Sequence, residues 1–205
     1  MNLQARKSAR TRQRILDATL DCLIERGYAR TSTNDIVARA GVSRGAMLHH
    51  FPSRNELFVA AIEHISRGQL DRFRDAVTNL PEAPAARIDQ AIELVWESFS
   101  QPAYAAILEL GIAARHEPEL AEGLRSAARR FEQEVAEVLR DLFASAGVTE
   151  QLLDLGQLLV NWLMHGMALS RLIDDRPDQQ QTGLEVIRTL ARQALASPEL
   201  LSNDG

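Results

Sequence analysis

Four consecutive residues, Ser43, Arg44, Gly45 and Ala46, combine side chains suited to contact nucleic-acid bases. At the start of a helix, a serine hydroxyl accepts a hydrogen bond from a free backbone N–H. An arginine there can donate two parallel hydrogen bonds to the O6 and N7 atoms of guanine. Gly45 and Ala46 would let the helix approach a DNA groove closely. We predict base contacts for Arg44, with a phosphate contact or a solvated charge as the alternative.

The elements that must position these residues are two short helices joined by a tight turn. The apolar positions of the two helical patterns are Ile36, Val37 and Ala40 in the first and Met47, Leu48 and Phe51 in the second. Thr33 and Ser43 are placed as N-caps, and Gly41 closes the first helix because it permits a left-handed turn. This arrangement predicts a helix-turn-helix, whose second helix fits the major groove of DNA.

Further DNA contacts are expected from residues near the starts of these helices. Hydroxyls and cations there can position a protein on phosphates without reading the sequence, which predicts phosphate contacts for Thr31, Thr33, Ser43, His49 and Arg54. For Thr33 and Ser43 the alternative is helix capping alone, and both roles are compatible.

Two other candidate sites each allow two interpretations. Met47 either contacts a thymine methyl group or belongs to the core, and its periodicity favours the core. Arg6, Lys7 and Arg10 form a basic arm. The arm either enters the minor groove or, as we favour, attracts the phosphates.

The charge distribution supports a basic N-terminal region with an anionic partner. The chain of 205 residues has a net charge of −5, which by itself argues against nucleic acid. Residues 1–55, however, hold ten Lys or Arg and four Asp or Glu, a net charge of +6, whereas the remainder has a net charge of −11. Such a split indicates a DNA-binding part attached to a domain with another role.

Helical signals run along the whole chain, and strand signals are nearly absent. Apolar spacing, caps and prolines predict helices at about residues 8–26, 54–79, 85–100, 102–115 and 118–146, a helix capped by Thr149 that extends to about residue 173, and a last helix that ends near residue 196. The sequence therefore predicts an all-α fold of about nine helices. A three-helix head would occupy residues 1–68, and a larger helical domain would occupy residues 69–205.

Composition narrows the class of protein further. The longest apolar run falls well short of the roughly 18 residues that indicate a membrane span, and the N-terminus lacks the apolar stretch of a signal peptide. The single cysteine, Cys22, excludes an intramolecular disulfide and fits a reducing compartment. We expect a cytoplasmic protein without a membrane partner.

A series of motifs in the first 60 residues carries a family resemblance. The motifs are Ile15-Leu16-x-Ala18, Glu25-Arg26-Gly27-Tyr28, Thr31-x-Thr33, Asp35-Ile36, Ala40-Gly41-Val42-Ser43-x-Gly45, His50-Phe51 and Ser53-Arg54-x-Glu56-Leu57. In order and spacing they resemble the TetR family of bacterial transcriptional regulators. The family often has an aromatic pair before His-Phe whose phenol reaches a phosphate, and here those positions are Leu48 and His49. Leucine cannot make that contact, whereas His49 could supply the second one.

The acidic body contains aromatic and methionine residues that could line a cavity. Trp96 and Phe99, Tyr104 and Leu108, and Met164 and Met167 form three pairs at helical spacing. Three such faces would make an apolar chamber for a small hydrophobic effector. The alternative is a filled helical core, and the resemblance favours the pocket for the set as a whole.

The last two predicted helices are the candidates for self-association, and the named interface residues lie on the one at about residues 150–173. Its apolar surface is wider than one face requires, and the candidate interface residues are Leu155, Leu159, Trp162 and Gly166. Because a lone helix-turn-helix reads too few base pairs to be selective, two-fold pairing is expected. The alternative is a fully buried central helix.

Together these features predict a homodimeric DNA-binding regulator, a repressor of a palindromic double-stranded operator that a small apolar effector releases. An architectural or partner-binding protein that works without an effector is the alternative. A helical enzyme is disfavoured because a nucleophile–base constellation, a metal-ligand cluster and a phosphate loop are not recognisable in the sequence. We expect no cofactor and no bound metal.

Overall fold

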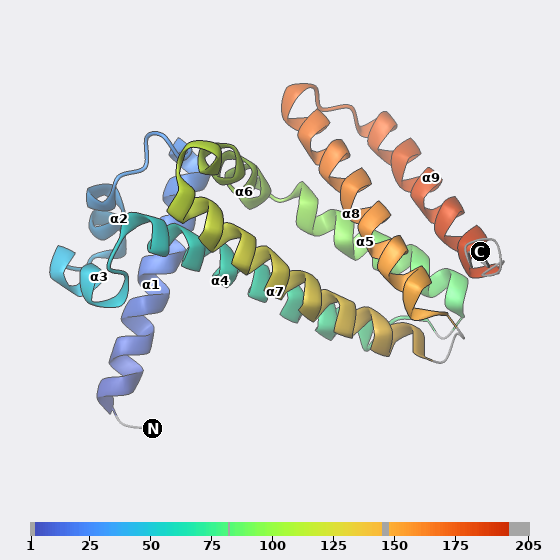
Figure 1. Ribbon diagram of the computed structural model, residues 1–205, viewed down its shortest axis with the longest axis horizontal. Helices are drawn as coiled ribbons and strands as arrows, with labels where there is room; N and C mark the ends of the chain where they lie inside the picture. The colour runs from blue at the N-terminus through green and yellow to red at the C-terminus, as the bar shows by residue number, and fades with distance from the viewer. Residues whose placement is uncertain (1–2, 82, 145–147, 197–205) are drawn as a thin grey trace. The chain divides into compact units, whose positions relative to one another are not determined.

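The computed structural model describes residues 3–81, 83–144 and 148–196, and the regular elements within these ranges are all helices (Figure 1). They are α1 (Leu3–Arg26), α2 (Thr33–Ala40), α3 (Arg44–His50), α4 (Arg54–Val77), α5 (Pro84–Ser100), α6 (Pro102–Ala113), the 3-10 turn η1 (Ala114–His116), α7 (Pro118–Phe143), α8 (Glu150–Ile173) and α9 (Pro177–Ala196). The all-α prediction, with nine α-helices in the described residues, is confirmed.

Side-chain caps start the helices at positions that the sequence largely predicts. Ser43 accepts the backbone N–H of Ala46 at 3.1 Å and starts α3, and Thr149 likewise starts α8. The prediction for α2 was wrong by one residue, because the N-cap is Ser32 rather than Thr33. Ser32 forms a reciprocal capping box with Asp35, three residues further on, which Thr33 cannot do.

Several helix ends differ from the sequence-based expectation, and α6 ends at Ala113 rather than near residue 115. α1 begins at Leu3 rather than near Ser8, which adds a basic turn to the helix. α4 ends at Val77 instead of Asn79, as helix ends commonly differ by one or two residues. The end expected near residue 146 lies outside the described residues.

The contacts divide the chain into two compact units. The first unit joins residues 1–68 with residues 102–131, and the second joins residues 69–101 with residues 132–205. α4 and α7 therefore contribute to both units. α6 begins at residue 102 and therefore lies entirely within the first unit.

The first unit has a continuous apolar core. Its fully buried side chains come from all of its longer helices, among them Ile15, Leu16, Ile36, Met47, Phe58, Leu110 and Leu120. α4 and α7 approach closely in this unit, since a Cβ atom at Gly123 would lie 2.6 Å from Val59 Cγ2. The helix-turn-helix thus shares one apolar core with α6 and the first part of α7.

The second unit is built around α5, α8 and α9, which contact one another pairwise (Figure 1). Ion pairs link α9 to α5, Arg188 with Glu93 and Arg192 with Asp89. Leu184 and Ile187 of α9 are buried. In the part of the chain that the structure describes, no helix has the length and apolar character that a membrane span requires.

Candidate DNA-binding surface

The turn between α2 and α3 is fixed by glycine geometry and by an arginine from α1. Gly41 adopts φ +60°, the left-handed conformation that favours glycine, and its N–H donates to the carbonyls at the end of α2. Arg14 Nη2 donates to the Ala40 carbonyl at 2.5 Å and to the Gly41 carbonyl at 3.2 Å. These bonds satisfy carbonyls that the end of α2 would otherwise leave without partners. Arg14 therefore ties the turn to α1.

α3 divides cleanly into a buried and an exposed side. Met47 is buried at 2% exposure, and Phe51, directly after the helix, is buried at 3%. Arg44, Gly45 and His49 are exposed. Since burial removes Met47 from any surface, the core interpretation holds for this residue and the thymine contact does not.

The exposed side of α3 also carries Leu48, at 43% exposure. The apolar pattern of the sequence placed this residue inward together with Met47. The short helix is seven residues long, so its core contact needs only Met47 and the following Phe51. Arg44 and Leu48 are four residues apart and therefore share one face of α3.

The residues predicted to contact phosphates lie in very different environments. Ser43 is exposed, and Thr33 is half-buried at the first position of α2. Thr31 is buried at 2% exposure, and its hydroxyl donates to the carbonyls of Cys22 at 3.0 Å and Gly27 at 2.8 Å. The Thr31 hydroxyl is therefore engaged in fixing the segment between α1 and α2, which is a structural role.

Arg54 likewise has a structural role that the sequence did not reveal. Its guanidinium lies between two aromatic rings, 4.3 Å from the centroid of Tyr28 and 4.5 Å from that of Phe58. It donates to the Tyr28 hydroxyl at 2.8 Å and to the carbonyls of Tyr28 and Thr31 at 2.9 Å and 3.2 Å. Three donor contacts and two ring faces hold this cation inside the unit, so its predicted phosphate role is not favoured.

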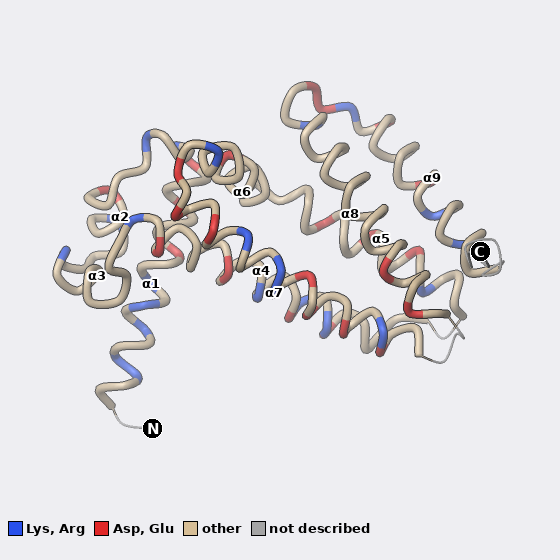
Figure 2. The backbone as a smooth tube through the Cα atoms, viewed as in Figure 1, with Lys and Arg blue, Asp and Glu red and all other residues tan. Residues whose placement is uncertain are grey.

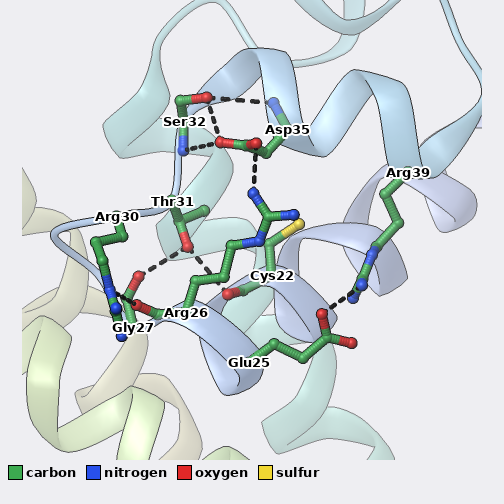
Figure 3. A network of polar contacts seen from close by, with 9 residues as sticks. All are labelled: Cys22, Glu25, Arg26, Gly27, Arg30, Thr31, Ser32, Asp35 and Arg39. Carbon is green, nitrogen blue, oxygen red and sulfur yellow. Dashed lines mark hydrogen bonds and ion pairs between the residues drawn. The ribbon is translucent and has the colours of Figure 1, made fainter.

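Polar contacts join α1 to both ends of α2 (Figure 3). Arg26 pairs with Asp35 at 2.5 Å, and Arg39 pairs with Glu25. Hydrogen bonds from Ser32 hold the pKa of the Asp35 carboxyl below its ordinary value. Because carboxylates neutralise Arg26 and Arg39, these cations add little to the field that a phosphate would meet.

A cluster of exposed positive charge lies along the N-terminal half of α1, and no ion pair of these cations is seen in the described residues. Arg6, Lys7 and Arg10 are exposed, and Figure 2 shows Lys and Arg gathered along this part of the helix. The arm is helical rather than extended. A helix with its side chains is about 10–12 Å across, which exceeds the roughly 6 Å width of the minor groove. The helical form therefore favours attraction of phosphates over insertion into the minor groove.

Tyr28 joins this surface to α6 and to the start of α7 within the first unit. Its backbone N–H donates to Glu109 Oε2 at 2.7 Å, and its hydroxyl contacts Glu117. Burial, followed by the hydrogen bond with Glu117, raises the pKa of the Tyr28 hydroxyl. The segment that precedes the helix-turn-helix is thus fixed to α6.

The residues predicted to line an effector pocket fall into both units. Trp96, Phe99, Met164 and Met167 lie in the second unit, whereas Tyr104 and Leu108 lie in the first. Trp96, Tyr104 and Met164 are buried. The ring of Phe99 lies edge-on to that of His165, with centroids 4.9 Å apart, and the Met167 sulfur lies 3.0 Å from where a Gly183 Cβ atom would stand.

The residues predicted for self-association are on the surface of α8. Leu159 is 46% exposed and Trp162 is 62% exposed, Gly166 is exposed, and Leu155 is half-buried. A Cβ atom at Gly166 would meet nothing within 4 Å. α8 is therefore not the fully buried central helix that was the alternative.

These features define a helix-turn-helix DNA-binding protein, and comparisons with known proteins identify its family. A family model of bacterial regulatory proteins, the tetR family, matches residues 15–61. The chain is 32% identical to the HTH-type transcriptional regulator CymR of Pseudomonas putida over 147 residues, which is 71% of each protein. It is 27% identical to the HTH-type transcriptional regulator Rv2912c of Mycobacterium tuberculosis over 91% of this chain and 95% of that protein. The chain belongs to the tetR family.

A solved structure supports the fold over nearly the whole length. The multidrug binding protein EbrR, complexed with imidazole, superposes with a TM-score of 0.64 at 24% identity, over 87% of this chain and 93% of that one. The protein is accordingly a DNA-binding transcriptional regulator rather than an enzyme.

Proposed function

We propose that the protein is a homodimeric repressor of a palindromic operator and that a small apolar effector releases it. Residues 1–68 would form the DNA-binding domain, and residues 69–205 the effector-binding and dimerisation domain. In the bound dimer, two α3 helices would enter successive major grooves about 34–36 Å apart. The protein would act in the cytoplasm, where the chromosome is accessible.

The observation that carries the dimer is the apolar surface of α8 and α9. The large apolar side chains exposed on these helices are Leu158, Leu159, Trp162, Leu163, Leu169, Leu172, Ile173, Val186 and Leu190. Large exposed apolar patches on soluble proteins commonly mark interaction sites. A second copy is the natural occupant because a palindrome presents two identical half-sites. Gly166, with open space above it, would let the partner helix approach closely.

The test exchanges a matched pair of exposed apolar residues for glutamate. Trp162 on α8 is 62% exposed and Ile112 on α6 is 63% exposed, so neither substitution disrupts the core of the monomer. We expect Trp162→Glu to give a monomer in light scattering and to lose tight operator binding, whereas Ile112→Glu remains dimeric. A Trp162→Glu protein that stays dimeric would refute an α8 interface.

As a repressor, the dimer would occupy the promoter and block transcription. A promoter that carries the operator should be transcribed less in vitro when the protein is added. Increased transcription in the same assay would make the protein an activator instead.

The effector proposal rests on the aromatic and methionine residues of the second unit. Trp96 is buried, Met164 is fully buried, and Phe99 lies against His165. The relative EbrR binds imidazole in its crystal structure. Burying the surface of an apolar ligand would supply most of its binding energy, roughly 25 cal/mol per Å² before ordering costs.

A regulator without an effector is the second candidate, and one observation favours it. Met167 lies close enough to Gly183 to fill the space between α8 and α9, as a core residue would. The chain has two tryptophans, so Trp162→Phe leaves Trp96 as the sole fluorophore of its kind. Titration with anilinonaphthalene sulfonate, an apolar aromatic probe, should then quench Trp96 saturably and release operator DNA. Operator binding that persists without quenching would favour the second candidate.

A further inference from the structure

Leu48 is an apolar side chain on the face of α3 that would meet DNA. It is 43% exposed, whereas the neighbouring core residues Met47 and Phe51 are 2% and 3% exposed. On the same face lies Arg44, four residues earlier, and the next residue along the chain is the exposed His49. Leu48 is therefore an apolar side chain left partly exposed, on the same face as a guanidinium and next in the chain to an exposed imidazole.

The chemistry of leucine restricts what this side chain can recognise. It cannot donate to a phosphate or accept from a base edge. In the major groove, the apolar group that projects from a base pair is the C5-methyl group of thymine. One helical turn advances about 5.4 Å, and successive base pairs lie about 3.4 Å apart. A thymine met by Leu48 would therefore lie one or two base pairs from the base contacted by Arg44.

The open space at Gly45, three residues before Leu48 and on a neighbouring part of the helix surface, suits such an approach. A Cβ atom at Gly45 would meet only the Ser43 hydroxyl oxygen, at 4.0 Å, so α3 presents a shallow surface next to Arg44. Because the helix can come close to the base edges there, a side chain as short as leucine can reach a methyl group.

We propose that Leu48 determines operator specificity by packing against a thymine methyl group one or two base pairs from the base that Arg44 contacts. The inference rests on the proposed insertion of α3 into the major groove. This contact would give the regulator a preference for thymine at an operator position where no hydrogen bond selects the base.

The experiment first selects an operator from a random duplex library with the intact protein and then removes single methyl groups. Each thymine of the operator is replaced in turn by deoxyuridine, which keeps the hydrogen bonds and lacks only the methyl group. Fluorescence anisotropy gives the dissociation constant of each duplex for the native protein, Leu48→Ala and Ile24→Ala. Ile24 is a matched control because it is an apolar residue of the same unit at 42% exposure.

For the native protein and Ile24→Ala, we expect one thymine per half-site whose methyl loss weakens binding about fourfold, the value of one buried methyl-sized group. For Leu48→Ala, the same replacement should have no effect. Equal sensitivity in the native protein and Leu48→Ala, or insensitivity to every methyl group, would overturn the inference while operator binding stands. Failure to enrich any duplex would instead overturn the proposed DNA recognition itself, and this inference with it.

Discussion

The carboxylate of Glu109 in α6 accepts the backbone N–H of Tyr28 at 2.7 Å, directly after the left-handed Gly27 that ends α1. Gly27 has φ +73°, and a Cβ atom there would lie 2.6 Å from Glu109 Oε2. The positive φ favours glycine at this position, and a Cβ atom would also force the Glu109 carboxylate to shift. The contact fixes the end of α1 to α6 within the first unit.

Gly27→Ala should lower the free energy of unfolding by about 1–2 kcal/mol, because alanine is strained at positive φ. Gly111→Ala is the control, since Gly111 lies within α6 with nothing within 4 Å of its Cβ position. Alanine there should stabilise the protein by about 0.5–1 kcal/mol through helix propensity. Urea denaturation measures both changes. A Gly27→Ala protein as stable as the native one would contradict this account of Gly27.

Arg44→Ala should weaken operator binding by about 1–3 kcal/mol per half-site and relax the base preference at one position. Arg39→Ala removes another exposed cation, from α2, that Glu25 already neutralises, so it should change binding little. Anisotropy titrations on the selected operator and on single-base variants distinguish the two outcomes. An equal loss on every duplex would make Arg44 a phosphate contact.

The basic face of α1 predicts a salt dependence that is independent of sequence. Replacing Arg6, Lys7 and Arg10 by alanine together should reduce the slope of log affinity against log salt by about one for each phosphate contact removed. The loss should be the same on operator and non-operator DNA. If base preference changed while the salt slope stayed constant, these residues would instead be reading bases.

The capping box of α2 predicts a pH-dependent stability. Hydrogen bonds from Ser32 lower the pKa of Asp35, so the stabilisation is fully present above the ordinary value of about 4. It is lost as pH falls through the lower folded value. The difference in unfolding free energy between the native protein and Ser32→Ala should therefore shrink below about pH 4.

Thr149→Ala is the control for this experiment. Thr149 caps α8 by accepting the backbone N–H of Leu152 at 3.3 Å, a contact without a carboxylate. The destabilisation by this variant should stay constant over the same range. If the destabilisation by Ser32→Ala and by Thr149→Ala shrank equally as pH falls, acid would be weakening the whole fold rather than the α2 cap.

The elements were largely predictable because their signals are local. Ser43 and Thr149 cap their helices through bonds to residues three positions away, and Gly41 ends α2 through its own backbone angle. The same local logic explains the error at Thr33, since the aspartate that completes the cap lies three residues after Ser32. Where one residue decides a boundary, the sequence is sufficient.

The roles of single side chains in the site were harder to predict because they depend on distant partners. Arg54 is enclosed by Tyr28, which lies 26 positions earlier, and Glu109 is 81 positions from the N–H that it accepts. The sequence groups Leu48 with the apolar positions of α3. Helical spacing assigns a residue to one face of a helix, but it does not give the width of the face that is buried. The packing of α6 against residues 1–68 is visible only in the three-dimensional contacts.

The two-sided construction of α3 also bears on how this regulator could evolve. Met47 and Phe51 supply the packing and Ser43 the cap, while Arg44, Leu48 and His49 point away from the core. Exposed positions of this kind tolerate substitution within about 0.5 kcal/mol of stability. Lineages that carry this fold can therefore exchange the outward side chains and acquire new target genes, because changes in binding preference leave the helix that carries them intact.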